Sequence, residues 1–474
     1  MQAFPHFNWR LQNTKDMNAI TQIEDLRKKQ LSFFSSGKTK DIKFRKDSLR
    51  RLRDSILKHD KDINEALRQD LHKSSFETYA TETGLVLHEI RSQLRNISRW
   101  ARPKTVRTPL FAWPSRSMIV PEPFGRVFII SPWNYPFQLP LVPLIGAIAS
   151  GNVAIIRQSR FSPYTNSLIK EILKESFSED HVAIVESDIE TAEAALKLRW
   201  DLIFFTGSTP VGKKIYAEAA LNLTPVILEL GGKSPVVVED DASIQVAARK
   251  IIWGKLIDAG QTCISPDYLF VNIKVKSTLI KKMKLEIDRM YGSNPIENPD
   301  YPKIISEKAF NRISSYIEQG EVIHGGRTDR GKLSIEPTLI EVSLEDKCME
   351  DEIFGPVLPV ITYTRLDEVI SYINSKEKPL SIYYFSTSRK KQNRMISETS
   401  SGACLINDVI LHFANNNLPF GGVGDSGMGR YHGKESFRAF SNMKAVMKSG
   451  SLIDIPIKYP PFKNKEWLIR LFLR

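Results

Sequence analysis

The first hundred residues carry apolar side chains at intervals of three and four, which is the spacing of one face of a helix. Leu49, Leu52 and Ile56 follow this pattern, and a similar series runs from Leu87 to Leu94, with charged residues between the apolar ones. The pattern predicts helices from residue 18 to about residue 105.

After Pro103 the helical spacing gives way to short apolar runs. Residues 117–120 and 125–130 read as two short strands separated by Pro121 and Pro123, because proline interrupts a strand ladder. Apolar runs and helical stretches then alternate, with strands expected at 153–156, 182–185, 202–205 and 225–230 and helices at 167–177, 191–198 and 211–220. Such alternation predicts a parallel sheet with crossover helices.

A second alternating block runs from Pro235 to about Tyr363 and includes helical stretches at 243–257 and 277–290. A chain of 474 residues corresponds to roughly three domains at about 150 residues each. The first sheet ends at Gly231 and Gly232, which permit a sharp change of direction. We therefore place a domain boundary at these glycines.

The composition is that of an ordinary soluble protein, with 42% hydrophobic and 26% charged residues. The net charge of +13 is spread along the chain, and no basic block carries interleaved aromatic residues, so nucleic-acid binding is not indicated. A soluble basic surface is the favoured interpretation, with attraction of anionic cofactors or acidic lipids as the alternative.

Three cysteines at irregular spacing form no disulfide framework and indicate a reducing compartment, so we expect a cytoplasmic protein. The cysteines and eight histidines show no zinc-type spacing, and no metal is predicted. The apolar stretch 127–156 contains four prolines and two asparagines and is not read as a membrane span. Residues 1–16 lack a signal-peptide core, and Met17 is an alternative start.

The run FTGSTPVG, residues 205–212, follows an expected strand and opens an expected helix. Its glycines let backbone N–H groups approach an anion, and the helix N-terminus adds partial positive charge, which suits a dinucleotide pyrophosphate. The run is neither the G-x-G-x-x-G fingerprint nor a P-loop, so an ordinary strand-to-helix turn is an equally good interpretation.

Cys263, in GQTCIS, follows a long expected helix and precedes the expected strand 268–271. A loop at this point can expose a thiol, whose thiolate form is a nucleophile. The alternative is a small, inert, buried side chain, which is the commoner role of a lone cysteine.

Two further side chains could assist such a thiol. Glu229 ends an otherwise apolar strand, and a carboxylate partly buried there would have a raised pKa suited to taking a proton from water. It could instead point at solvent or at Lys233. Asn134 lies between two prolines, where its amide could donate to an oxyanion or simply belong to a turn.

Taken together, these runs resemble the aldehyde dehydrogenases from about residue 18 to the end. The matching runs are SPWNYPF, GNVAIIR, FTGSTPVG, LELGGKSP, GQTC, EIFGPV and PFGGVGDSGMG. The chain is most similar to the class 3 branch, which acts on fatty and aromatic aldehydes. Several runs are close to the form of that branch, namely NLTPV, YHGK, YPP, and Asn407-Asp408 with His412.

The resemblance implies a reaction scheme. Cys263 attacks the aldehyde carbonyl, Asn134 and the Cys263 backbone N–H hold the oxyanion, hydride leaves to nicotinamide, and Glu229 activates water to hydrolyse the thioester. Glu352 matches the nicotinamide-ribose ligand and Phe354 packs near that ring. The further cofactor positions are Trp133, Gly207, Ser208, Gly212, Leu230 and Gly231. The alternative interpretation is structural: residues 354–356 would then form only a tight turn, and Trp133 would be only a core residue.

The sequence departs from the family at the adenosine end of the cofactor. Family members commonly have Lys-Pro-Ser-Glu where this chain has Arg157-Gln158-Ser159-Arg160. Glutamate repels a 2′-phosphate, whereas Arg160 can pair with one. We therefore expect NADP to be accepted at least as well as NAD. Alternatively, Arg160 points outward and NAD binds through Arg157 and the backbone.

We therefore expect an α/β enzyme with a Rossmann-like cofactor domain, an α/β catalytic domain and a small oligomerisation element. The expected division is an N-terminal extension 1–17, a helical and NAD(P)-binding part 18–230, a catalytic part 231–418, and 419–474 for the return to the cofactor domain, oligomerisation and the tail.

We expect a homodimer that uses NAD or NADP. Its expected substrates are apolar aldehydes, for which Tyr135, Phe137 and Phe413 are candidate contacts. A CoA-acylating enzyme and a cofactor-binding protein without catalysis are the rivals, and the presence of Glu229 and Cys263 speaks against them. Residues 463–474 could contact a membrane as a basic amphipathic helix, but we expect them to pack near the subunit contact.

Overall fold

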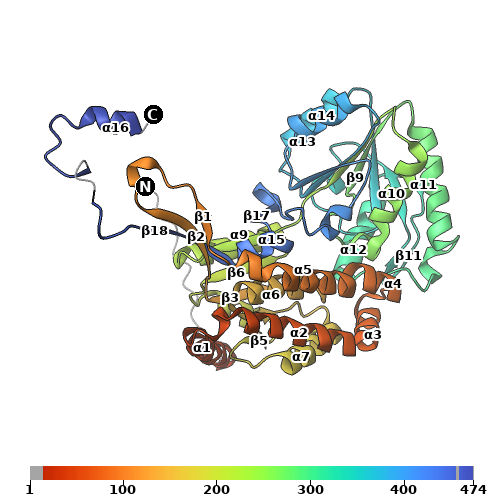
Figure 1. Ribbon diagram of the computed structural model, residues 1–474. Coiled ribbons are helices and arrows are strands. Elements are labelled where there is room, and N and C mark those ends of the chain that lie inside the picture. Colours follow the sequence, from red (N-terminus) through yellow and green to blue (C-terminus); the bar gives the residue numbers. More distant parts are fainter. Residues whose placement is uncertain (1–13, 455–457, 473–474) are drawn as a thin grey trace, which may run out of the picture.

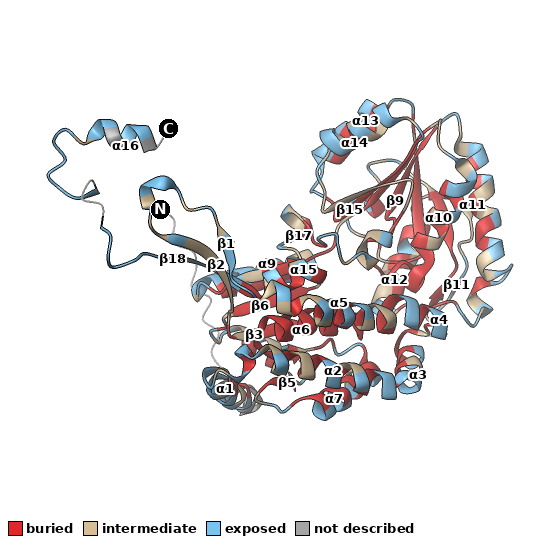
Figure 2. Cartoon of the chain, viewed as in Figure 1, coloured by how far each residue is buried: buried red, intermediate tan, exposed pale blue. Residues whose placement is uncertain are grey.

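The computed structural model describes residues 14–454 and 458–472 (Figure 1). Two sheets, one of six strands and one of seven, form the centres of two lobes, and a three-stranded sheet projects from the first lobe as an arm. The strands inside both lobes are buried, as Figure 2 shows for β9 and β15. The helices that cover the sheets carry exposed residues on their outer faces.

Helices occupy the chain up to Trp100, as the apolar spacing predicts. Leu49, Leu52, Ile56 and Ile90 are all fully buried, so the predicted helix faces do pack into the core. The helices are α1 (Thr14–Ser35), α2 (Ile42–Lys58), α3 (Asp60–Leu71), α4 (Ser75–Thr78) and α5 (Gly84–Trp100), with a π-helical turn, η2 (Tyr79–Thr83), between the last two.

The six-stranded sheet has the order β17-β7-β6-β3-β4-β5, and all its strand pairs are parallel except β17 with β7. Its strands are β3 (Arg126–Ile130), β4 (Val153–Arg157), β5 (Val182–Val185), β6 (Leu202–Thr206), β7 (Val226–Glu229) and β17 (Gly427–Met428). The connecting helices are α6 (Gln138–Ser150), α7 (Pro163–Ser176), α8 (Ile189–Leu196) and α9 (Thr209–Leu221). The predicted parallel sheet with crossover helices is thus confirmed as a Rossmann-type arrangement.

The seven-stranded sheet has the order β10-β13-β14-β9-β8-β15-β16, with β10 antiparallel at one edge. Its strands are β8 (Pro235–Val238), β9 (Tyr268–Asn272), β10 (Glu321–His324), β13 (Thr338–Glu341), β14 (Val357–Tyr363), β15 (Ser381–Phe385) and β16 (Ala403–Ile406). The helices that follow them are α10 (Ile244–Leu256), α11 (Lys276–Tyr291), α12 (Glu307–Ile317), α13 (Leu366–Ser375) and α14 (Arg389–Glu398). The chain passes from β7 of the first sheet to β8 of the second within Leu230–Ser234.

The apolar stretch 127–156 forms β3, α6 and β4, and every residue of α6 is buried. This all-round burial explains why the helix is apolar on every side. Among the described residues, no helix is both long enough and apolar enough to cross a membrane.

The arm consists of β1 (Lys104–Val106), β2 (Arg116–Pro123) and β18 (Ser441–Lys448), which lie in the order β1-β2-β18. The prediction that Pro121 and Pro123 interrupt the strand is wrong, because β2 continues through both. β1 pairs with β2 only at 117–119, so the prolines lie where one edge of β2 is open and a missing N–H breaks no ladder on that side. The C-terminal helix α16 (Glu466–Phe472) lies against η3 (Leu110–Ala112) at the tip of the arm.

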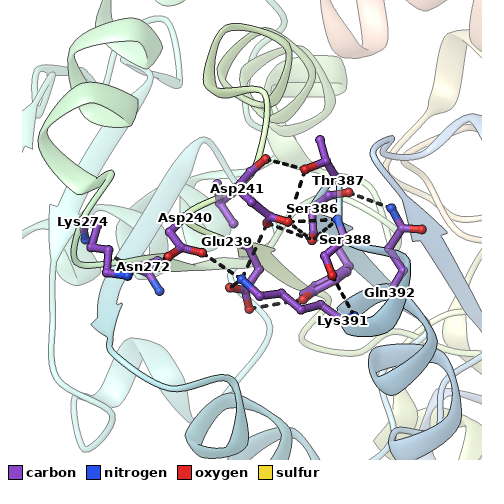
Figure 3. A network of polar contacts seen from close by, with 12 residues as sticks. Glu239, Asp240, Asp241, Asn272, Lys274, Ser386, Thr387, Ser388, Lys391 and Gln392 are labelled. Carbon is purple, nitrogen blue, oxygen red and sulfur yellow. Dashed lines mark hydrogen bonds and ion pairs between the residues drawn. The ribbon is translucent and has the colours of Figure 1, made fainter.

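A polar network secures the carboxyl end of β8 (Figure 3). Lys391 of α14 forms ion pairs of 2.8 Å with both Glu239 and Asp240. Asp241 accepts hydrogen bonds from the Ser386 hydroxyl and the Ser388 backbone N–H, which ties the start of α14 to the end of β8. These contacts join α14 to the carboxyl end of β8.

Candidate active site

A cleft of about 830 Å³ lies between the two sheets, beside the crossing from β7 to β8. A smaller cavity of about 50 Å³, lined almost wholly by apolar groups, adjoins it. The two spaces share five lining residues, which are Leu139, Thr206, Glu229, Leu230 and Cys263. The predicted thiol and carboxylate therefore lie where the larger cleft and the smaller apolar cavity meet.

Cys263 is carried by a loop with an unusual backbone. Asp258, Ala259 and Gly260 all adopt positive φ angles, of 50°, 49° and 77°. At Gly260 a Cβ would lie 2.3 Å from the Gly355 carbonyl oxygen, so only glycine fits. After this left-handed turn, which follows α10, the partly exposed Cys263 lies in the lining of the cleft.

The surroundings of Cys263 favour the protonated thiol. Burial raises its pKa to about 12, with further increases from the neighbouring Glu352 and Glu229 carboxyl groups. Because the thiolate is the nucleophile, this thiol needs a nearby positive charge to become reactive at neutral pH.

Asn134 is buried and lines the cleft. Its side-chain amide donates a 2.9 Å hydrogen bond to the Gln261 carbonyl oxygen, two residues before Cys263. The amide is therefore tied to the loop that carries Cys263.

Glu229 ends β7 and is buried. Within the described chain, neither carboxylate oxygen has a hydrogen-bond partner. Burial raises the pKa of Glu229 well above its ordinary value, and Arg430 offsets only part of this effect. The alternative interpretation, an ion pair with Lys233, is wrong, because the Lys233 ammonium donates to Asp267 at 2.6 Å instead.

The predicted anion-binding turn opens on the cleft. Gly207 and Ser208 line it at the start of α9, and the Ser208 side chain does not cap the helix. Backbone N–H groups in the first turn of a helix lack intrahelical partners and can face an anion. Gly212 lies outside the lining and serves packing, since a Cβ there would lie 2.5 Å from Leu230.

Glu352 and Phe354 line the wall contributed by the second lobe. Burial is the main cause that raises the pKa of Glu352 to about 8. A Cβ on Gly231 would lie 2.2 Å from a Glu352 carboxyl oxygen, so this close approach requires glycine. Phe354 has a positive φ of 52°, a strained backbone of the kind found at functional sites. Its ring meets that of Trp133 edge-on, with centroids 5.6 Å apart.

Arg157 and Arg160 lie outside the lining of this cleft. Arg157, at the end of β4, donates to the backbone carbonyls of Ser187 at 2.7 Å and Asp188 at 3.0 Å. Arg160 is exposed, with Phe161 as an aromatic neighbour. Burial is the main cause that lowers the pKa of Arg157, and Arg160 lowers it further, so the two guanidinium groups are electrostatic neighbours.

Arg312, which lines the cleft, belongs to none of the sequence motifs. Arg312 of α12 donates to the backbone carbonyls of Glu352 and Ile353 and holds that wall in place. Phe420 and Tyr431 line the apolar cavity. Both lie in runs that match the family, Phe420 in PFGGVGDSGMG and Tyr431 in YHGK, whereas Arg312 lies in none of these runs. Of the candidate substrate contacts, Tyr135 and Phe413 line the cavity, whereas Phe137 lies in the core and not in the cavity lining.

The chain matches known proteins over most of its length. Residues 14–446 match the aldehyde dehydrogenase family model. The 4,4′-diaponeurosporen-aldehyde dehydrogenase of Staphylococcus aureus is 44% identical over 94% of this chain and 97% of its own length. The aldehyde dehydrogenase family 3 member A2 of Pongo abelii is 42% identical, with 90% and 89% covered. The dimeric NADP-preferring aldehyde dehydrogenase of Canis lupus familiaris is 39% identical, with 93% and 98% covered.

The fold matches as well. A substrate-bound structure of Staphylococcus aureus AldH superposes with a TM-score of 0.94 at 43% identity, covering 95% of this chain and 99% of that one. The chain belongs to the aldehyde dehydrogenase family, in its class 3 branch, whose members oxidise aldehydes to carboxylic acids with NAD or NADP.

Proposed function

We propose that Cys263, Glu229 and Asn134 carry out the aldehyde oxidation of this chain. The observation that carries the proposal is the position of the thiol and the carboxylate, which both lie where the larger cleft joins the apolar cavity. An aldehyde whose apolar part fills the cavity would present its carbonyl to Cys263. The larger cleft, on the other side of Cys263, would then bind the dinucleotide.

The cleft fits NAD or NADP. Its volume suits part of such a cofactor, the start of α9 offers N–H groups to a pyrophosphate, and Gly231 leaves room that a side chain would fill. The residues that would hold the cofactor are Trp133, Gly207, Ser208, Leu230, Gly231, Glu352 and Phe354. Gly212 supports the α9 start by packing, and Arg157 and Arg160 lie toward the adenosine end. When bound, the oxidised cofactor supplies the hydride acceptor.

The protein side of the first step is nucleophilic addition. The Cys263 thiolate forms a bond to the carbonyl carbon, and the carbonyl oxygen becomes an oxyanion. The Asn134 amide, which is held beside Gln261 in the absence of substrate, and the Cys263 backbone N–H donate to that oxygen. Donors fixed in place before the reaction stabilise the developing charge without reorganisation.

The last step is hydrolysis of the thioester that hydride loss leaves on Cys263. Glu229 is the base, because its carboxyl oxygens are free of other described partners and its raised pKa makes it a stronger proton acceptor. It takes a proton from water, the resulting hydroxide attacks the acyl carbon, and the thiol leaves with the carboxylate as product.

Apolar aldehydes, medium- or long-chain aliphatic or aromatic, are the substrates that the cavity favours. Leu139, Ile257, Ile410, Phe413 and Phe420 line it. Burial of apolar surface stabilises such substrates by about 25 cal/mol for each Å². The names of the relatives, a diaponeurosporen aldehyde dehydrogenase and a family 3 member, agree with this class of substrate.

A panel of aldehydes tests the proposal. We expect kcat/KM, measured by NAD(P)H formation, to rise from acetaldehyde to hexanal and benzaldehyde by at least about tenfold, since roughly two buried methylenes account for this factor. Succinic semialdehyde is the charged control and should be a poor substrate. Equal kcat/KM values across the panel, or a preference for the semialdehyde, would contradict the assignment of the apolar cavity.

Arg160 makes NADP at least as good a cofactor as NAD in this proposal. The side chain is exposed beside Arg157 and is available to pair with a 2′-phosphate. The NADP-preferring canine relative supports this expectation. We expect Arg160→Glu to lower kcat/KM for NADP by about tenfold or more, which corresponds to one charge-assisted contact, and to leave NAD nearly unchanged.

The matched control is Arg289→Glu, an exposed arginine on α11, which makes the same charge change in the other lobe. The ratio of the two kcat/KM values is the measurement. A ratio that Arg160→Glu does not alter would mean that Arg160 points away from the cofactor.

We also propose a cytoplasmic homodimer that uses the arm, whose tip exposes Leu110, Phe111 and Trp113. The dimeric canine relative supports this assembly. The working units would be 18–230 for the cofactor and 231–418 for catalysis, with 419–474 returning to the first sheet and the arm. In this scheme the tail 463–474 packs at the subunit contact rather than on a membrane. Most of the extension 1–17 lies outside the described residues.

A further inference from the structure

Lys73 is a buried ammonium group that lies outside the lining of both the cleft and the cavity. It donates to the Glu82 carboxylate at 2.8 Å and to the Asn134 backbone carbonyl at 2.7 Å. Its nitrogen lies 4.0 Å from the centre of the Tyr135 ring and 3.8 Å from an Asp258 carboxyl oxygen. A buried charge is costly unless it is paired, and these contacts supply that pairing.

The contacts of Lys73 keep it charged. Burial alone would lower its pKa, but the nearby Asp258 and Glu82 carboxyl groups outweigh burial and raise it. The charged form of Lys73 is therefore favoured, and its nitrogen contacts the Asn134 carbonyl oxygen directly.

The partners of Lys73 hold the segment that carries Asn134. The second oxygen of Glu82 accepts hydrogen bonds from the backbone N–H groups of Phe137 at 3.0 Å and Gln138 at 2.8 Å. These groups lie at the start of α6, which no side chain of its own caps. Glu82 therefore serves as the cap, and Lys73 orients Glu82 while it binds the Asn134 carbonyl directly.

The same cluster holds the start of the loop that carries Cys263. Glu77 accepts a 2.6 Å hydrogen bond from the Asp258 backbone N–H, the first of the left-handed residues. The Tyr135 hydroxyl, on the ring that faces Lys73, is hydrogen-bonded to the Thr262 hydroxyl next to Cys263. The thiol loop and the Asn134 segment are thus joined around one ammonium group.

We propose that Lys73 is a positioning residue for the oxyanion site. It sets the distance between the Asn134 amide and the Cys263 loop, and thereby the geometry in which the tetrahedral oxyanion is stabilised. This role rests on the proposed function of Asn134 and Cys263. Lys73 itself does not touch the substrate.

A purely structural role would predict a loss of stability only. A positioning role predicts, in addition, a loss of kcat that depends on Asn134. We expect Lys73→Met to lower kcat by about 10- to 100-fold, because a misplacement of about 1 Å has this effect, while the fluorescence-measured Kd for NADPH stays within about twofold of the parent value, since the variant leaves the cofactor contacts intact.

A double-mutant cycle with Asn134→Ala is the decisive measurement. Asn134→Ala alone should lower kcat by about 100-fold or more, the usual effect of losing an oxyanion donor. The kcat of the double variant should lie within about threefold of the kcat of Asn134→Ala, because the effects of residues that act through one another are not additive. Glu82→Gln, which keeps the size of the side chain, serves in the same cycle if Lys73→Met does not fold.

The matched control is Lys391→Met, which removes a lysine paired with three carboxylates outside the lining of the cleft. Lys391→Met should lower Tm. Any loss of kcat that it causes should multiply with the loss caused by Asn134→Ala when the two changes are combined in one variant. If the kcat losses of Lys73→Met and Asn134→Ala also multiplied in the double variant, or if Lys73→Met left kcat unchanged, the positioning role of Lys73 would be overturned. The assignment of Asn134 would not be affected. An unchanged kcat in Asn134→Ala would overturn the assignment of Asn134, and this proposal with it.

Discussion

Replacing Cys263 with alanine is expected to lower kcat for aldehyde oxidation by a factor on the order of 10⁴ or more, the usual cost of losing a catalytic nucleophile. Cys263 is the only cysteine of this chain that lines the cleft or the cavity among the described residues. No neighbouring thiol can therefore replace it. The measurement is NAD(P)H formation under saturating aldehyde and cofactor, followed over hours for the variant.

The matched control for this prediction is Cys404→Ala. Cys404 lies in β16, outside both lined spaces, and its loss should leave kcat within about twofold, since a change away from the reacting groups removes no transition-state contact. Cys263→Ala should still bind NADPH, which separates loss of chemistry from loss of the fold. Turnover of Cys263→Ala at more than a few per cent of the parent rate would exclude a thioester on this residue.

The raised pKa of Cys263, about 12 without cofactor, does not contradict this role. The thiol lies between the Glu352 and Glu229 carboxyl groups, which disfavour a thiolate. A cationic ring in the cleft would lower the pKa of a neighbouring thiol.

Much of the fold could be predicted because its elements have local causes. The buried helix faces and the alternation of strands and helices both follow from the spacing of apolar residues. What could not be predicted depends on distant partners. β17 has only two residues and exists because it pairs with β7, about 200 positions earlier. β2 continues through two prolines because β1 ends before reaching them.

The residues of the candidate site also fall into those that local sequence predicts and those that depend on distant partners. Cys263, Glu229 and Asn134 lie in runs whose local chemistry is visible in the sequence. Arg312 is an ordinary helix residue until the fold places it under the Glu352 backbone. Lys73, in the run DLHKSS, resembles a surface lysine. Its burial and its contact with the Asn134 carbonyl arise only from tertiary packing.

Replacing Glu229 with glutamine is expected to convert steady turnover into a single rapid burst. The amide keeps the shape of the side chain but cannot take a proton from water. Cys263 should therefore form its thioester and release a stoichiometric amount of NAD(P)H, after which hydrolysis should limit turnover. General-base catalysis contributes about 10²- to 10⁴-fold, so the steady-state rate should fall by at least about 100-fold. Rapid-mixing absorbance shows the burst, and intact-protein mass spectrometry shows the acyl group on the enzyme.

The pH dependence gives the Glu229 prediction a second readout and a control. Burial raises the pKa of Glu229 well above its ordinary value. Its basic form therefore becomes more populated, and the parent enzyme hydrolyses its thioester faster, as the pH rises through this raised pKa. Glu229→Gln should lose this dependence. Glu239→Gln, which alters a buried glutamate of the network in Figure 3, should keep it and show no burst. If Glu229→Gln turned over at the parent rate, or accumulated no acyl-enzyme although the first NAD(P)H formed, another group would have to activate the water.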